Sequence, residues 1–233
     1  EGVIRIYDIF LDESETLLAQ DKKIREFANE MKLKNNFSSA DFNYALGKFV
    51  LKNAKFPERS FLAEAARHGV PVYYDSNSNH SIALNNAASF LDGKSVNPSS
   101  ILDVLESAAI AYSSKQEGFV ELGGGGPKNF IQQTGPTIQQ ILGIDFEGAD
   151  RGLQITTAIE RDGGLSSCTF SEGVSWGKYK DASKNLVQIF SEYSIVFPLI
   201  AGYVLENCNA RKHKNLMETK EKMLEKLKKD RKQ

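Results

Sequence analysis

The sequence has few of the residues that mark disulfide-bonded, metal-binding or membrane-spanning proteins. Its 233 residues include two cysteines, Cys168 and Cys208, which is too few for a disulfide framework and lacks metal-ligand spacing. The three histidines are scattered and also predict no metal site. There is no run of about 18 apolar residues, so we expect no membrane span. No signal-peptide pattern opens the chain. These absences favour a reducing, cytoplasmic setting.

The chain as a whole also lacks a large net charge, because its 29 basic residues nearly balance its 30 acidic residues. Residues 211–233 hold ten basic and four acidic side chains, so the preceding 210 residues hold 19 basic and 26 acidic ones. Nucleic-acid-binding proteins carry basic patches, so an acidic body excludes that class and is compatible with a cationic ligand. We expect one catalytic domain over residues 1–210 and a basic helical tail over 211–233.

The hydrophobic pattern alternates strands with helices. This order predicts an α/β fold with a doubly wound, mostly parallel, Rossmann-like sheet. The expected strands are 3–7, 70–74, 119–122, 153–156 and 186–190. The expected helices are one capped by 12–14, then 38–51, 57–68, 82–91, 98–113, 127–142 and 195–207. Open α/β sheets bind ligands beyond the carboxyl ends of their strands. We therefore expect the site in the segments 75–81, 123–129, 157–178 and 191–192.

Four consecutive glycines, Gly123–Gly126, follow one expected strand and open a helix. Glycine lets the backbone approach a ligand closely, and the helix amides behind it can hold a phosphate. Neither the dinucleotide fingerprint nor the P-loop fingerprint is complete here. The alternative is a flexible connection between a strand and a helix.

The stretch Glu172–Lys178 contains the residues that are most capable of chemical reaction or ligand binding. Lys178 lies two residues from the single tryptophan, Trp176, with Glu172 nearby. A lysine in a desolvated aromatic slot is an amine nucleophile that forms Schiff bases. Alternatively, the Trp face and the carboxylate bind a cationic amine. The spacing alone favours a simpler arrangement, a half-buried tryptophan beside a surface lysine.

Two further segments carry weaker signals. Asp162-Gly163-Gly164 is first a turn signal. Glu192 follows an expected strand, where an acidic residue can accept hydrogen bonds from ribose hydroxyls.

Several of these segments resemble one protein family. Leu122–Thr134 resembles the glycine segment of deoxyhypusine synthases, in their bacterial and archaeal-like branch. Glu172–Lys178 resembles the lysine motif of that family, and Ser194–Leu199 matches the segment after its last strand. The resemblance covers about residues 1–208. The Ser-Trp-Gly-Lys order is specific, so it favours the catalytic interpretation of Lys178.

The resemblance implies an NAD-dependent transferase of hypusine biosynthesis that moves an aminobutyl group from spermidine to an acceptor amine. That acceptor is most simply the lysine of the hypusine-bearing translation factor precursor. Two alternatives stay open: transfer to putrescine, as in homospermidine-forming relatives, or a non-catalytic paralogue that assembles with an active subunit. The family pattern also implies a homotetramer with sites at a dimer interface, and neither a nucleic-acid nor a membrane partner.

The resemblance assigns roles to single residues, with Lys178 as the catalytic, imine-forming lysine. The expected substrate-binding residues are Asn129, Gly163, Gly164, Leu165, Glu172 and Trp176. The expected cofactor-binding residues are Asn79, Ser81, Gly123, Gly124, Gly125, Thr157, Ala158, Asp162, Glu192 and Tyr193. Leu165 and Asn129 stand where eukaryotic members carry Asp and His, and Asn79 stands where an Asp meets the cofactor. We also expect the chain to lack the N-terminal segment that supplies part of the family's cofactor site.

Overall fold

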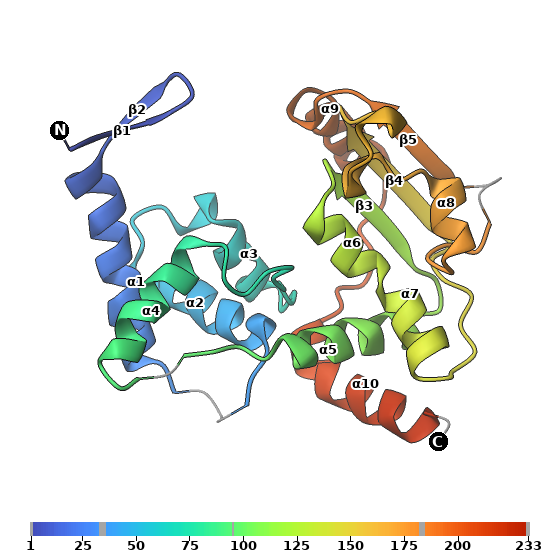
Figure 1. Ribbon diagram of the computed structural model, residues 1–233, viewed down its shortest axis with the longest axis horizontal. Helices are drawn as coiled ribbons and strands as arrows, with labels where there is room; N and C mark the ends of the chain where they lie inside the picture. Colours follow the sequence, from blue (N-terminus) through green and yellow to red (C-terminus); the bar gives the residue numbers. More distant parts are fainter. Residues whose placement is uncertain (1, 33–35, 95, 182–184, 232–233) are drawn as a thin grey trace. The chain divides into compact units, whose positions relative to one another are not determined.

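The structure is a computed structural model that describes residues 2–32, 36–94, 96–181 and 185–231 (Figure 1). The chain divides into two compact units, Glu1–Ser100 and Ile101–Gln233, and each is described by itself. The expected division into residues 1–210 and 211–233 stays a prediction.

The first unit consists of a hairpin followed by helices. Its elements are β1 (Val3–Ile6), β2 (Ile9–Asp12), a π-helical turn (Glu13–Leu18), α1 (Ala19–Glu30), α2 (Ser39–Asn53), a 3₁₀ turn (Pro57–Arg59), α3 (Phe61–Arg67) and α4 (Ser81–Leu91). The expected opening strand is confirmed, and it pairs antiparallel with β2 outside the parallel sheet. The helix expected over residues 57–68 is interrupted at Ser60, which caps α3.

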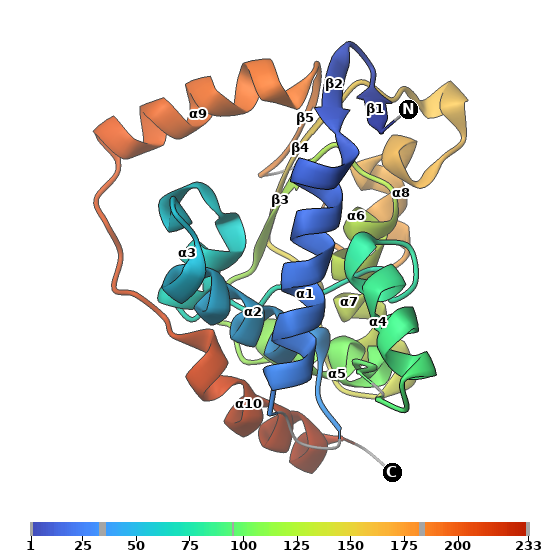
Figure 2. The same cartoon turned by 90° about the vertical axis from the view of Figure 1, so that its left-hand side faces the viewer.

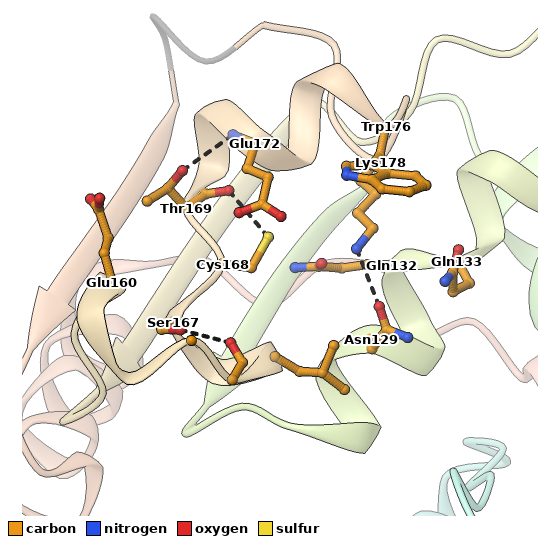
Figure 3. A pocket seen from close by; sticks show the side chains of 13 residues that line it. Asn129, Gln132, Gln133, Glu160, Ser167, Cys168, Thr169, Glu172, Trp176 and Lys178 are labelled. Atoms are coloured by element: carbon orange, nitrogen blue, oxygen red, sulfur yellow. Dashed lines mark hydrogen bonds between the residues drawn. The ribbon is translucent and has the colours of Figure 1, made fainter.

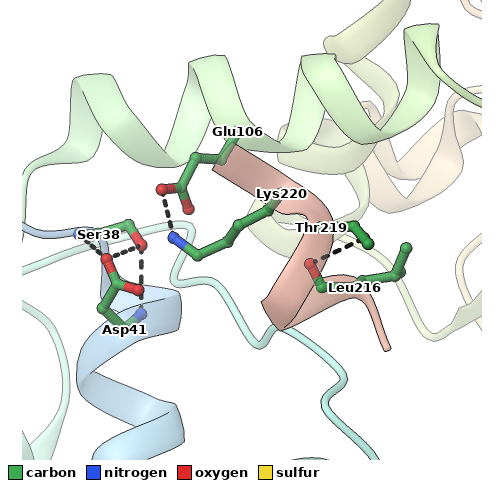
Figure 4. A network of polar contacts seen from close by, with 6 residues as sticks. All are labelled: Ser38, Asp41, Glu106, Leu216, Thr219 and Lys220. Atoms are coloured by element: carbon green, nitrogen blue, oxygen red, sulfur yellow. Dashed lines mark hydrogen bonds and ion pairs between the residues drawn. The ribbon is translucent and has the colours of Figure 1, made fainter. Parts of the chain in front are cut away.

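Caps and aromatic packing explain where the helices of this unit begin and meet. Ser38 and Asp41 form a reciprocal capping box that starts α2 (Figure 4). Phe27 of α1 packs edge-on against Phe42 of α2, with ring centroids 5.4 Å apart. Figure 2 shows α4 running beside α1, where Asn85 donates a hydrogen bond to Asp21. The core of the unit is therefore built from helices.

The strand expected over residues 70–74 is wrong. This segment pairs with no strand in the described part of the chain. Two of its backbone groups bind side chains of α2 instead. Asn43 donates to the Val72 carbonyl at 2.8 Å, and the Tyr74 amide donates to Ser39 Oγ at 3.0 Å. Buried backbone groups need partners, and helix side chains supply them here in place of a neighbouring strand.

The second unit contains a parallel sheet. Its elements are α5 (Ser100–Tyr112), β3 (Gly118–Leu122), α6 (Gly126–Gln132), α7 (Thr134–Pro136), a π turn (Thr137–Ile141), β4 (Arg151–Thr156), 3₁₀ turns (Glu160–Asp162 and Leu165–Ser167), α8 (Phe170–Ser175), β5 (Leu186–Phe190), α9 (Tyr193–Asn207) and α10 (Leu216–Asp230). The strands lie in the order β3-β4-β5 and all pairs are parallel. The predicted α/β fold of the Rossmann-like type is confirmed.

The register of the sheet aligns Glu121, Gln154 and Gln188 in one row across the three strands. Side chains alternate between sheet faces, so this row shares a face with Phe119. On that face Glu121 and Gln154 are buried, while Val120 on the opposite face is 61% exposed. The buried face of the sheet is thus partly polar, and the candidate site lies above it.

The core of this unit joins α5 to the C-terminal helix. Leu227 of α10 is 2% exposed and belongs to a cluster with Ala108, Ala109 and Ile138. Lys220 of α10 forms an ion pair with Glu106 of α5, and both side chains are buried (Figure 4). One face of the basic C-terminal helix is therefore packed rather than solvated.

Candidate active site

A pocket of about 710 Å³ lies in the second unit, between α6, α8 and the loop that follows β4 (Figure 3). It is lined by Asn129, Gln132, Gln133, Glu160, Gly163, Gly164, Leu165, Ser167, Cys168, Thr169, Glu172, Trp176 and Lys178. Lys178 and all of the predicted substrate-binding residues are in this set. Residues up to 49 positions apart in the sequence are thus brought to one pocket, as the contact between Asn129 and Lys178 shows.

Lys178 is buried at the wall of this pocket, with 7% of its surface exposed. Its Nζ donates to Asn129 Oδ1 at 3.2 Å. Its backbone is fixed on both sides, because Lys178 N donates to Gly173 O and Lys178 O accepts from Ala149 N, each at 3.0 Å. The alternative of a surface lysine is therefore wrong, and the amine is held in a defined position.

Close packing of the lysine segment requires a glycine on the neighbouring turn. A Cβ atom at Gly135 would lie 2.4 Å from the carbonyl oxygen of Gly177, which is too close for any side chain. Gly135 therefore lets α7 press against the backbone that carries Lys178.

Acidic and aromatic side chains line the same pocket as the lysine. Glu172 lies in the first turn of α8, where its amide donates to the capping Thr169 Oγ1 at 3.2 Å. Glu160 reaches the same pocket from the turn after β4. Trp176 also lines the pocket, and the residue is 55% exposed. Two carboxylates and an indole make a setting that receives a cation.

The glycine segment positions the loop over the pocket. A Cβ atom at Gly124 would lie 2.6 Å from Ser166 Cα, so the segment touches the loop that carries Leu165 and Cys168. α6 and its C-cap residue Gln133 then present Asn129, Gln132 and Gln133 to the pocket, and the spacings of three and four place them on one helix face. This finding gives the glycines a packing role, and their contact with a ligand stays a prediction.

A buried lysine supports the pocket from below. Lys128 Nζ donates to the Cys168 carbonyl at 2.8 Å and to Gln154 Oε1 at 3.2 Å. Burial lowers the pKa of Lys128, and the nearby Glu121 carboxylate opposes that shift. Burial also raises the pKa of the Cys168 thiol, which favours its protonated form. Lys128 thus fixes the Cys168 loop to the sheet.

The predicted cofactor-binding residues do not line this pocket. Gly123, Gly124, Gly125, Thr157, Ala158, Glu192 and Tyr193 follow the carboxyl ends of β3, β4 and β5. Asp162 accepts a hydrogen bond from Ile159 N at 2.8 Å, and Glu192 caps α9 by accepting from Ser194 N at 2.7 Å. Asn79 and Ser81 belong to the first unit, at the start of α4. Their role in cofactor binding stays a prediction.

Sequence reasoning gave no role to several pocket residues: Gln132, Gln133, Ser167, Cys168 and Thr169. The helical spacing from Asn129 was a usable signal for the two glutamines. Ser167, Cys168 and Thr169 carried no such signal, because their position depends on how the loop folds back onto α6.

Comparison with known protein families identifies the family of this chain. The family described as deoxyhypusine synthase matches residues 1–204. The chain belongs to the deoxyhypusine synthase family. The predicted resemblance is thereby confirmed at the level of the family.

Curated relatives of this family come from bacteria and archaea. A deoxyhypusine synthase-like protein of Nostoc punctiforme is 39% identical over 99% of the chain and 61% of the relative. A probable deoxyhypusine synthase 2 of Methanosarcina acetivorans is 41% identical over 86% of the chain and 57% of the relative. The chain thus spans about three fifths of the length of these relatives. Among the described residues, no helix is long and apolar enough to cross a membrane.

Proposed function

We propose that the protein takes part in NAD-dependent transfer of an aminobutyl group from spermidine to an acceptor amine. The observation that carries the proposal is the buried Lys178 amine in a pocket with two carboxylates and an indole ring. A polyamine is a flexible chain of ammonium groups, and Glu160, Glu172 and Trp176 supply acidic and aromatic partners for it. Membership in the deoxyhypusine synthase family supports the same substrate class.

Lys178 has the central chemical role in this proposal. A hydride leaves spermidine, 1,3-diaminopropane departs, and Lys178 Nζ forms an imine with the remaining aminobutyl group. The acceptor amine then displaces Lys178, and return of the hydride reduces the new imine to a secondary amine. Asn129 Oδ1, at 3.2 Å from Lys178 Nζ, orients the amine toward the pocket.

NAD is the hydride carrier that this reaction needs. The predicted cofactor residues of the second unit follow the carboxyl ends of neighbouring parallel strands, the edge at which α/β sheets bind dinucleotides. Beside Asp162, a Cβ atom at Gly163 or Gly164 would meet no described atom within 4 Å, so the backbone there borders open space. These features fit a dinucleotide that Gly123, Thr157 and Glu192 would help to hold. Bound NAD would accept the hydride from spermidine and later return it.

The acceptor and the assembly belong to the same proposal. The lysine of a translation factor precursor is the first acceptor to test, and putrescine is the second. A homotetramer is supported by apolar side chains that stay exposed in the second unit, such as Ile195, Leu199 and Tyr203 of α9. A non-catalytic paralogue with an active partner subunit remains the alternative, and a cytoplasmic location stays a prediction.

The test is covalent trapping at Lys178. The purified protein is incubated with spermidine and NAD, reduced with borohydride and digested for mass spectrometry. We expect an aminobutyl adduct on the peptide that carries Lys178. A Lys178→Arg variant should give no adduct, because a guanidinium stays protonated and forms no imine.

Lys180→Arg is the matched control, because Lys180 is two residues away and pairs with Asp150 outside the pocket. This variant should be labelled as the wild type is. Equal labelling of Lys178→Arg and the wild type would refute the role of Lys178. Adding putrescine or the acceptor protein before reduction then shows which amine removes the adduct.

A further inference from the structure

A closed triangle of hydrogen bonds lies directly beneath the pocket. Glu121 Oε1 accepts from Gln132 Nε2 at 2.5 Å and from the Tyr179 hydroxyl at 2.8 Å. The Tyr179 oxygen in turn accepts from Gln132 Nε2 at 3.0 Å. All three residues are at most 5% exposed. The triangle therefore joins β3, α6 and the residue that follows Lys178.

Burying Glu121 requires compensation. Its second oxygen, Oε2, is buried and has no hydrogen-bond partner among the described residues. The nearby Lys128 ammonium contributes a favourable charge interaction. Burial, followed by the charge of Glu121, raises the pKa of Tyr179, so its hydroxyl keeps the proton that it donates. A carboxylate in such a place costs stability unless its contacts are satisfied, which suggests a use beyond packing.

The triangle fixes the orientation of the Gln132 amide. A carboxylate only accepts hydrogen bonds, so the amide nitrogen of Gln132 must face Glu121. The other polar atom of the amide, Oε1, accepts no hydrogen bond from the described residues, and it keeps some exposed surface although the residue as a whole is only 2% exposed. Gln132 also lines the pocket, and Figure 3 shows it on the same side as Asn129 and Lys178. Gln132 therefore presents its carbonyl oxygen, and not its NH₂ group, to the pocket.

We propose that Glu121 is a positioning residue for amine binding. It holds the Gln132 amide so that its carbonyl oxygen accepts a hydrogen bond from an amine or ammonium group beside Lys178. Glu121 itself touches no ligand and acts through Gln132, with Tyr179 as the second group that fixes the amide. The proposal takes its ligand class, a polyamine, from the proposed function.

Glu121→Gln is the informative substitution. The new amide has the size of the native side chain but offers either a donor or an acceptor to Gln132. The Gln132 amide is then free to turn over, and part of the population presents its NH₂ group to the ligand. We expect spermidine, measured by titration calorimetry, to bind about three- to tenfold more weakly. Gln132→Leu removes the acceptor altogether and should weaken binding about tenfold or more.

The double variant distinguishes a positioning role of Glu121 from a purely structural role. If Glu121 acts on the ligand through Gln132, then Glu121→Gln/Gln132→Leu binds spermidine as Gln132→Leu does, within about twofold. A purely structural role for Glu121 predicts that the two losses multiply, and that result would overturn the proposal.

Gln133→Leu is the matched control, because Gln133 lines the same pocket from the next position in the chain, whereas the described hydrogen bonds to Glu121 come from Gln132 and Tyr179. Its effect should multiply with that of Glu121→Gln. If Glu121→Gln does not fold, Tyr179→Phe takes its place in the cycle, because it removes the other group that binds Gln132 Nε2.

The outcomes also separate this proposal from the proposed function. Coupled binding effects without a borohydride-trapped adduct would refute the reaction and retain the positioning role. A trapped adduct with independent effects of Glu121 and Gln132 would refute the positioning role alone. A wild-type protein that binds no spermidine at millimolar concentration would refute both.

Discussion

Leu227→Ala tests whether the C-terminal helix is part of the core of the second unit. Leu227 is 2% exposed and lies in a cluster with Ala108, Ala109, Ala111 and Ile138. Removing three carbon atoms forfeits about 2 kcal/mol of burial free energy, at roughly 0.8 kcal/mol per methylene. The cavity left behind adds to this loss, because the surrounding side chains relax into it only in part. We expect a total loss of about 3–5 kcal/mol in the free energy of unfolding.

Urea unfolding followed by tryptophan fluorescence measures this loss. The single tryptophan, Trp176, lies in the second unit, so its emission reports on the unit that contains α10. The matched control is Lys222→Ala, an exposed position of the same helix, which should change the free energy by about 0.5 kcal/mol or less. A Leu227→Ala loss below about 1 kcal/mol would refute the reasoning, and would show that α10 is a solvated tail.

Two further predictions concern charge. Burial, and then the charge of Asp150, raises the pKa of Glu117 from its ordinary value of 4.5 to about 7. The folded chain thus holds this proton more tightly than the unfolded chain does, so stability should fall by about 3 kcal/mol as pH rises from 4.5 to above 7. Glu117→Gln should flatten that part of the pH profile of the melting temperature, and an unchanged profile would contradict it. Leu165→Asp places a carboxylate in the pocket and should tighten spermidine binding about ten- to hundredfold in calorimetry. An unchanged affinity would show that Leu165 does not face the amine.

The sheet and its crossovers were predictable because their signals are local. The strands β3, β4 and β5 are apolar runs bounded by turn residues, and helices were expected after β3 and β5. The short helix α8, in the crossover from β4 to β5, was not expected from the sequence. Segment 70–74 has the same local signal but forms no ladder, and Asn43 and Ser39 of α2 bind its backbone instead. Such side-chain bonding over about 30 residues leaves no trace in hydrophobic periodicity.

The residues of the candidate site that lie together in one sequence motif were predictable, and those that only the fold brings to the pocket were not. Lys178, Trp176 and Glu172 are adjacent in the sequence, so their chemistry could be read together. Cys168 reaches the pocket only because Lys128 holds its carbonyl and Gly124 leaves room for Ser166. Both conditions are long-range contacts, which a single sequence does not display.

The strand β3 shows why the polarity of its side chains did not predict which of them are buried. A strand with Val120 and Leu122 on one face and Glu121 on the other would ordinarily turn the glutamate to solvent. Here Glu121 is 5% exposed and Val120 is 61% exposed, which reverses the usual pattern. The reversal is explained by what each face contacts. The glutamate face supports the pocket through Gln132 and Tyr179, and the opposite face presents an apolar row that runs from Val120 to Val187, which is 52% exposed. Exposed apolar rows favour association, so the same reversal that supports the pocket also supports the proposed assembly.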